Sequence, residues 1–147
     1  MQTMKKAADV FRDLGVSFNT YTVSAHRNPE LLVKIIDKLE KDGTEVIIAG
    51  AGLAAHLPGV VASCTLLPVI GVPLASGGLG GLDALLSIVQ MPRQIPVATV
   101  GIDNAANAAY LACQILAIKY PELKTTLDNF RKKMKEDLAQ NGGEIEL

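Results

Sequence analysis

Residues 45–59 read EVIIAGAGLAAHLPG, an apolar β-type run that leads into a glycine-marked turn and then into a helical pattern. We expect residues 45–49 to form a short buried strand, and residues 53–64 to form a helix around an interruption at Pro58 and Gly59. A buried strand followed directly by a helix is typical of proteins in which helices cover a mostly parallel sheet. The segment therefore predicts an α/β fold.

The same alternation of helix and strand runs through the rest of the chain. Expected helices cover residues 4–14, 29–39, 82–90, 104–119 and about 121–139, and expected strands cover residues 16–23, 67–72 and 96–102. This order implies parallel strands joined by right-handed crossovers, and hence a three-layer, doubly wound sheet. Folds of this kind normally begin with a strand, so we expect the N-terminal strand to be missing.

The composition argues against several classes of protein. With 147 residues, of which 49% are apolar, the chain is long enough for one domain with a substantial core. Its 14 basic and 15 acidic residues leave a net charge of −1, so we expect no nucleic-acid partner. The sequence shows neither a membrane span nor a secretory signal, which predicts a cytoplasmic protein with no membrane partner.

The two cysteines, Cys64 and Cys113, lie far apart in apolar, helix-like contexts. We expect both to be buried thiols. Because no Cys, His or carboxylate cluster has metal-ligand spacing, the sequence predicts no metal site.

The two histidines, His26 and His56, each lie in a short loop after a strongly apolar run. In a parallel sheet both would come out at the carboxyl edge, where open α/β sheets bind ligands. His26 precedes the expected N-cap Asn28, at the positive end of a helix dipole that attracts anions, and Arg27 adds a fixed charge. A base beside an anion site suits proton transfer on a phosphorylated or carboxylated small molecule. The alternative is a capping loop whose His and Arg only bond nearby backbone.

Two further segments near these loops are rich in glycine. Gly50 and Gly52 flank Ala51 in a turn whose amides a ligand can approach, although the segment completes neither a Walker loop nor a dinucleotide-binding pattern. Residues 73–81 carry four glycines and predict a mobile loop. His56 is either a second residue of the site or a helix histidine bonded to backbone.

Six segments together resemble the family of N5-carboxyaminoimidazole ribonucleotide mutases, the bacterial-type catalytic subunits of the phosphoribosylaminoimidazole carboxylase step in purine synthesis. They follow one another in the family's order over nearly the whole chain: residues 24–27 (SAHR), 49–59 (AGAGLAAHLPG), 67–73 (LPVIGVP), 81–83 (GLD), 87–92 (SIVQMP) and 96–100 (PVATV). The second segment is similar to that of the mutase class and differs from that of the class that uses carbon dioxide.

The resemblance implies a flavodoxin-like three-layer fold, a homo-octamer, isomerase activity and no cofactor. The implied reaction converts N5-carboxyaminoimidazole ribonucleotide to 4-carboxyaminoimidazole ribonucleotide: the carboxylate leaves N5 as carbon dioxide and is captured by ring carbon C4. His26 matches the catalytic acid and base that handles the protons at both atoms. The substrate-binding residues implied by the resemblance are Ser24 and Arg27 near the phosphate, and Gly52, Ala54 and His56 along the aminoimidazole and its carboxylate.

The chain departs from the family at its start. Family members begin with a strand and a Gly-Ser-x-Ser-Asp loop that contacts the phosphate and ribose, and this sequence has neither; Leu53 also stands where Gly is usual. Either the sequence begins at an internal Met, or the chain is an inactive truncated subunit. Direct carboxylation of aminoimidazole ribonucleotide by carbon dioxide is a further alternative.

The last two expected helices carry apolar stripes that exceed what one small sheet face covers. We therefore expect residues 1–147 to form a single catalytic domain, whose helix at about 121–139 packs on neighbouring subunits of a symmetric homo-oligomer.

Overall fold

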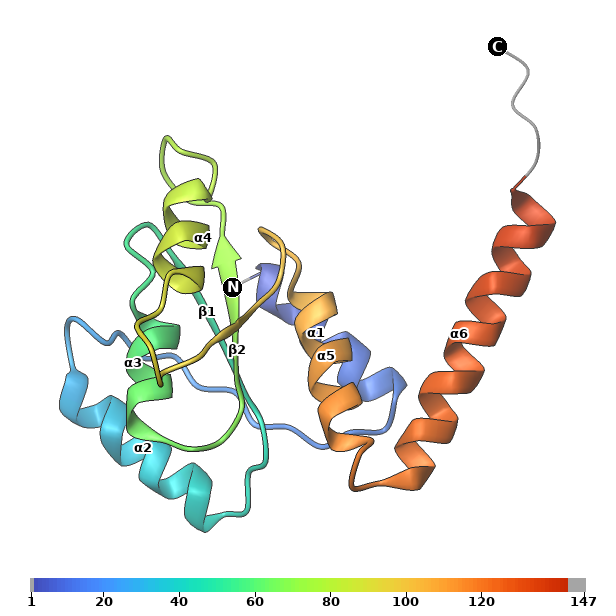
Figure 1. Ribbon diagram of the computed structural model, residues 1–147, viewed down its shortest axis with the longest axis horizontal. Helices are drawn as coiled ribbons and strands as arrows, with labels where there is room; N and C mark the ends of the chain where they lie inside the picture. The colour runs from blue at the N-terminus through green and yellow to red at the C-terminus, as the bar shows by residue number, and fades with distance from the viewer. Residues whose placement is uncertain (1, 143–147) are drawn as a thin grey trace.

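A computed structural model of the protein describes residues 2–142, without the side chain of Asn141 (Figure 1). Its elements are α1 (Gln2–Asp13), α2 (Pro29–Lys41), β1 (Ile47–Gly52), α3 (Leu57–Cys64), β2 (Val69–Leu74), α4 (Leu82–Val89), β3 (Ala98–Thr99), α5 (Ala105–Leu116) and α6 (Pro121–Asn141). The strands are parallel and lie in the order β1-β2-β3. The predicted parallel α/β sheet is confirmed.

Helices cover both faces of this sheet (Figure 1). On one face α1 and α5 bury Ile70 and Val72 of β2. On the other face, Leu32 and Ile36 of α2 and the apolar side of α3 form a cluster around Val69. Because alternate side chains of a strand point to opposite faces, β2 is covered on both sides. The chain thus has the predicted three layers.

Small residues allow the helices to approach the sheet closely. Four alanines of α5 have exposed fractions of 0–2%. On the opposite face, a Cβ at Gly71 of β2 would collide with the side chain of Ile88 in α4, so β2 needs glycine there. This close packing explains how a chain with few aromatic residues fills its core.

The expected strand at residues 16–23 is not formed. Within the described chain, the backbone of residues 17–23 makes no hydrogen bond to another strand, and the segment passes as an extended connection from the α1 side of the sheet to the α2 side (Figure 1). Side chains attach this segment to the rest of the chain. For example, the ring of Phe18 packs against that of Phe11, with the ring centroids 5.6 Å apart. The composition of this segment is typical of strands, but a strand also needs a neighbour to complete its hydrogen bonds.

Several element boundaries differ from expectation: β1 and β2 each begin two residues later, α5 ends at Leu116, and the largest differences are at α3 and β3. Residues 53–56 belong to a turn, and α3 begins at Leu57, so Pro58 lies in the first helical turn and does not interrupt the helix. Proline is favoured in a first turn because the amide it lacks would have no partner there. The expected strand at 96–102 is reduced to Ala98–Thr99, because only Ile70 and Gly71 of β2 pair with it.

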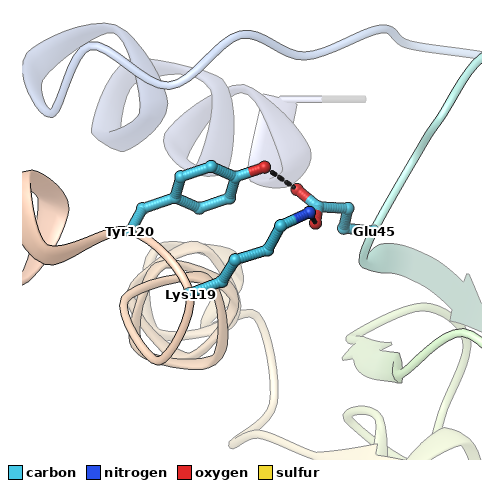
Figure 2. Close-up of polar contacts among 3 residues, drawn as sticks. All are labelled: Glu45, Lys119 and Tyr120. Carbon is cyan, nitrogen blue, oxygen red and sulfur yellow. Dashed lines mark hydrogen bonds and ion pairs between the residues drawn. The ribbon is translucent and has the colours of Figure 1, made fainter.

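The corner between α5 and α6 is bonded to the chain just before β1 (Figure 2). Glu45 Oε1 accepts from Lys119 Nζ at 2.6 Å, and Glu45 Oε2 accepts from the Tyr120 hydroxyl at 2.8 Å. The hydrogen bonds from Lys119 and Tyr120 lower the pKa of Glu45. These contacts hold the start of α6 against the segment that precedes β1.

Helix α6 extends away from the rest of the described chain (Figure 1). Its first half packs on α5 through Leu123 and Leu127, which are buried. Its second half exposes Phe130, Met134 and Leu138 by 40%, 44% and 63%. Neither α6 nor any other helix within residues 2–142 combines the length and apolarity needed to span a membrane.

The two thiols differ in environment. Cys113 is buried between α5 and α6, and this burial raises its pKa to about 11. Cys64 is exposed, so the expectation of a buried thiol is wrong for this residue. Cys64 is the last residue of α3, three residues after Val61, which packs in the cluster on the sheet.

Candidate active site

The structure brings His26 and His56 into direct contact, although 30 positions separate them in the sequence. His26 Nε2 lies 2.7 Å from His56 Nδ1, and the ring centroids are 4.8 Å apart in an edge-to-face arrangement. A hydrogen bond needs a proton on one nitrogen and a lone pair on the other, so the two imidazoles share one proton across this contact. Both residues are exposed, so a ligand can reach them.

A turn in front of α2 holds His26. The amide of Asn28 donates to the carbonyl of Ser24 at 3.0 Å, and Asn28 Oδ1 accepts from the amide of Leu31 at 3.0 Å. The predicted N-cap is thereby confirmed. His26 and Arg27 consequently stand at the positive end of α2, which favours a bound anion.

His56 occupies the N-cap position of α3, but its side chain makes no capping bond. The backbone around it is fixed: its amide donates to the carbonyl of Ala54 at 2.7 Å, and its carbonyl accepts from the amide of Val60 at 2.9 Å. Ala55 is 1% exposed and packs against α4. The imidazole of His56 therefore bonds His26, and the interpretation of a helix histidine bonded to backbone does not describe it.

The remaining residues singled out from the sequence lie in the same two turns. Ser24 and Arg27 belong to the turn that carries His26, Gly52 is the last residue of β1, and Ala54 lies between Gly52 and His56. Because α3 begins beyond the carboxyl end of a parallel strand, its positive end also faces this edge. The edge thus combines two imidazoles and the positive ends of two helices, with Arg27 in the turn that carries His26.

The glycine-rich loop after β2, residues 75–81, lies against the turn that leads to His56. A Cβ at Gly52 would collide with Ser76 Oγ, and a Cβ at Gly77 would lie 2.7 Å from Leu53 Cδ2. Leu53 itself has a φ of 56°, in the left-handed region that favours glycine. The two loops therefore pack closely against each other, just before the turn that carries His56.

Asp103, which follows β3, joins this edge although sequence reasoning missed it. Its amide donates to the carbonyl of Pro73 at 2.9 Å, and its Oδ1 accepts from the amide of Ala75 at 3.1 Å. The available signal was the pair Asp103–Asn104 in front of an Ala-rich helix, which indicates a cap. Asn104 fills that capping role by accepting from the amide of Asn107.

The chemistry of this edge is that of a proton carrier next to an anion site. Within residues 2–142, no group of three or more His, Cys, Asp or Glu side chains is placed to hold a metal ion. An imidazole can release and recover a proton near neutral pH, and a hydrogen bond from a second imidazole fixes the orientation of its ring.

A doubly wound parallel sheet with polar side chains at its carboxyl edge is typical of α/β proteins that bind small molecules there. Within that class, the chain belongs to the AIR carboxylase family, whose sequence profile matches residues 1–137.

Individual relatives agree with this family. The chain is 55% identical over 146 residues to an N5-carboxyaminoimidazole ribonucleotide mutase of Pyrococcus horikoshii, covering 99% of this chain and 82% of that protein. It is 50% identical over 141 residues to the mutase of Escherichia coli K12, covering 95% and 83%. The crystal structure of Treponema denticola PurE superposes with a TM-score of 0.88 at 25% identity, covering 96% and 88%.

Proposed function

We propose that this protein converts N5-carboxyaminoimidazole ribonucleotide to 4-carboxyaminoimidazole ribonucleotide in purine biosynthesis. The observation that carries the proposal is the identity of 49–55% to mutases of Pyrococcus, Thermotoga and Escherichia over at least 95% of this chain. The contact between His26 and His56 supports it, because the reaction needs a proton carrier beside a bound phosphate ester.

The two isomers differ in the position of a carboxylate and of a proton. When the bond from N5 to the carboxylate breaks, carbon dioxide leaves and N5 takes up a proton. When C4 then captures the carbon dioxide, a new carbon–carbon bond forms and the proton on C4 is lost. One proton is given and one is recovered, so a single imidazole can perform both transfers without an external acid.

We assign these transfers to His26, with His56 holding its ring through the 2.7 Å hydrogen bond. We assign the binding of the substrate's phosphate to Ser24 and Arg27, together with the amides at the start of α2. Gly52 and Ala54 line the aminoimidazole beside His56. A pocket closed to water would retain the released carbon dioxide until C4 captures it.

The test supplies purified protein with one of two substrates and follows 4-carboxyaminoimidazole ribonucleotide by ultraviolet absorbance. With N5-carboxyaminoimidazole ribonucleotide, we expect product at low bicarbonate. Product formed only from aminoimidazole ribonucleotide and bicarbonate would assign direct carboxylation instead. No product from either substrate would identify an inactive subunit.

We further propose that the chain works as a homo-octamer in the cytoplasm, as one catalytic domain whose α6 packs on neighbouring subunits. The exposed side chains of Phe130, Met134 and Leu138 support the oligomer, because an apolar stripe of this kind is normally covered. The charge of a phosphorylated substrate supports the location, because such molecules do not cross membranes unaided.

Light scattering tests the assembly. The wild-type protein should have about eight times the chain mass of 15.5 kDa. Met134→Glu should lower that mass, because it places a charge in the stripe, whereas the matched control Lys132→Glu should leave it unchanged. A monomeric wild-type protein would contradict the proposal.

A further inference from the structure

The glycine-rich loop, residues 75–81, is fixed at both ends and open in the middle. At its start, the amide of Ala75 donates to Asp103 Oδ1 at 3.1 Å. At its end, Gly81 has a φ of 89° and lies so close to Ile102 that a Cβ there would be 2.8 Å from Ile102 Cγ2. Between these points, a Cβ at Gly78 or Gly80 would meet no atom within 4 Å. The segment after β3 therefore holds the base of the loop and leaves its tip free.

Asp103 is held in a backbone conformation that ordinary residues avoid. Its φ is 56°, in the left-handed region, where Asp and Asn are tolerated better than other non-glycine residues. In this conformation its amide reaches Pro73 at the end of β2 and its carboxylate reaches Ala75. One residue thus makes hydrogen bonds to the chain on both sides of Leu74, where β2 becomes the loop.

The loop that Asp103 holds packs against the end of β1 and the turn that leads to His56. Ser76 lies against Gly52 and Gly77 lies against Leu53, in the turn that leads to His56. A shift at Ala75 would therefore move the residues that pack against Gly52 and Leu53, and so could displace the turn that leads to His56.

We propose that Asp103 is a positioning residue, which fixes the base of the glycine-rich loop so that its free tip can fold over the bound substrate. The statement about substrate rests on the proposed function. The statement about the loop base rests on the hydrogen bonds of Asp103 alone, and its test does not need turnover.

Three variants separate the hydrogen bond from the backbone conformation. Asp103→Gly keeps the left-handed φ but removes the acceptor for Ala75. Asp103→Asn keeps both, because an amide oxygen also accepts and Asn tolerates this φ. Gln94→Gly is the matched control: Gln94 also has a positive φ, of 75°, but lies in the loop before β3, at the opposite edge of the sheet.

The first readout is amide hydrogen exchange of residues 76–80 in the free protein. Asp103→Gly should accelerate this exchange about tenfold, and Asp103→Asn and Gln94→Gly should leave it within about twofold of wild type. The second readout is kinetic: Asp103→Gly should raise KM about tenfold with a smaller change in kcat, and Asp103→Asn should restore KM. Circular dichroism and thermal melting confirm that the variants are folded.

Each outcome decides one statement. Unchanged exchange in Asp103→Gly would overturn the role of Asp103 at the loop base, and so would equal acceleration in Asp103→Asn. Faster exchange with unchanged KM would overturn the link between loop and substrate. A wild-type protein without mutase activity would refute the proposed function while the exchange data still decide the loop base.

Discussion

The contact between Gly52 and the glycine-rich loop makes a sharp prediction for Gly52→Ala. The new Cβ would collide with Ser76 Oγ, which can rotate away, but it would also lie 3.1 Å from both Ser76 Cβ and the carbonyl oxygen of Leu74. These two atoms must each give way by a few tenths of an ångström. Overpacking of this size costs about 1–2 kcal/mol, which corresponds to about a 5- to 30-fold change in an equilibrium constant.

The assay compares kcat/KM and urea unfolding for a matched set. Gly52→Ala should lower kcat/KM by about 5- to 30-fold if the cost falls on the loop position required for substrate. Gly78→Ala, the control for packing, adds the same methyl group where no atom lies within 4 Å, so its urea unfolding should match that of wild type. Ser76→Gly removes the colliding side chain and should restore part of the activity of Gly52→Ala, because residues in contact are energetically coupled.

Two results would refute this reasoning. If Gly52→Ala matches Gly78→Ala in urea unfolding and wild type in kcat/KM, the loop is not packed against β1 as described. If Ser76→Gly restores nothing in the Gly52→Ala background, the defect does not arise from this contact.

Three further predictions concern stability and thiol chemistry. Ile70→Ala should lower the free energy of unfolding by about 2–5 kcal/mol in urea titrations, because Ile70 is 0% exposed in the central strand; a loss below about 1 kcal/mol would contradict that packing. Near pH 8, a thiol reagent should label one thiol per folded chain, the exposed Cys64, and two after unfolding, because burial raises the pKa of Cys113 to about 11; two fast thiols in the folded protein would contradict this burial. Glu45→Gln should lower the urea midpoint at pH 7. The difference from wild type should shrink as pH falls below 4.5, because the hydrogen bond from Lys119 lowers the pKa of Glu45 from 4.5, and the stabilisation by the Glu45 carboxylate is lost when it is protonated. A difference that grows on acidification would contradict this prediction.

The parts of the fold that the sequence predicts are those governed by local patterns. Apolar periodicity, the cap at Asn28 and the Gly-marked turns locate the helices and the two main strands, since each signal lies within a few residues. The strand expected at residues 16–23 does not form, because a strand depends on a hydrogen-bonding partner far along the chain, which no local pattern specifies. The length of β3 was overestimated for the same reason, since pairing with β2 limits it to two residues.

The site was predictable as a location but not as an arrangement. The rule for parallel sheets correctly places His56 at the carboxyl edge, after β1. It placed His26 there through a strand at residues 16–23 that does not form, and the turn before α2 is what brings His26 to His56. Their 2.7 Å contact depends on how the turns at residues 24–28 and 53–56 bend, which no local pattern specifies. Asp103 was missed because its role comes from a left-handed φ and a hydrogen bond to a segment 28 positions away.

The most direct test of the proposed mutase reaction follows the carboxylate itself. N5-carboxyaminoimidazole ribonucleotide labelled with ¹³C in its carboxylate is incubated with the protein in unlabelled bicarbonate, and the product is analysed by mass spectrometry. Wild-type protein should give 4-carboxyaminoimidazole ribonucleotide that retains the label, and folded His26→Asn should reduce turnover by orders of magnitude. Product that has lost its label, or His26→Asn with wild-type turnover, would contradict the account.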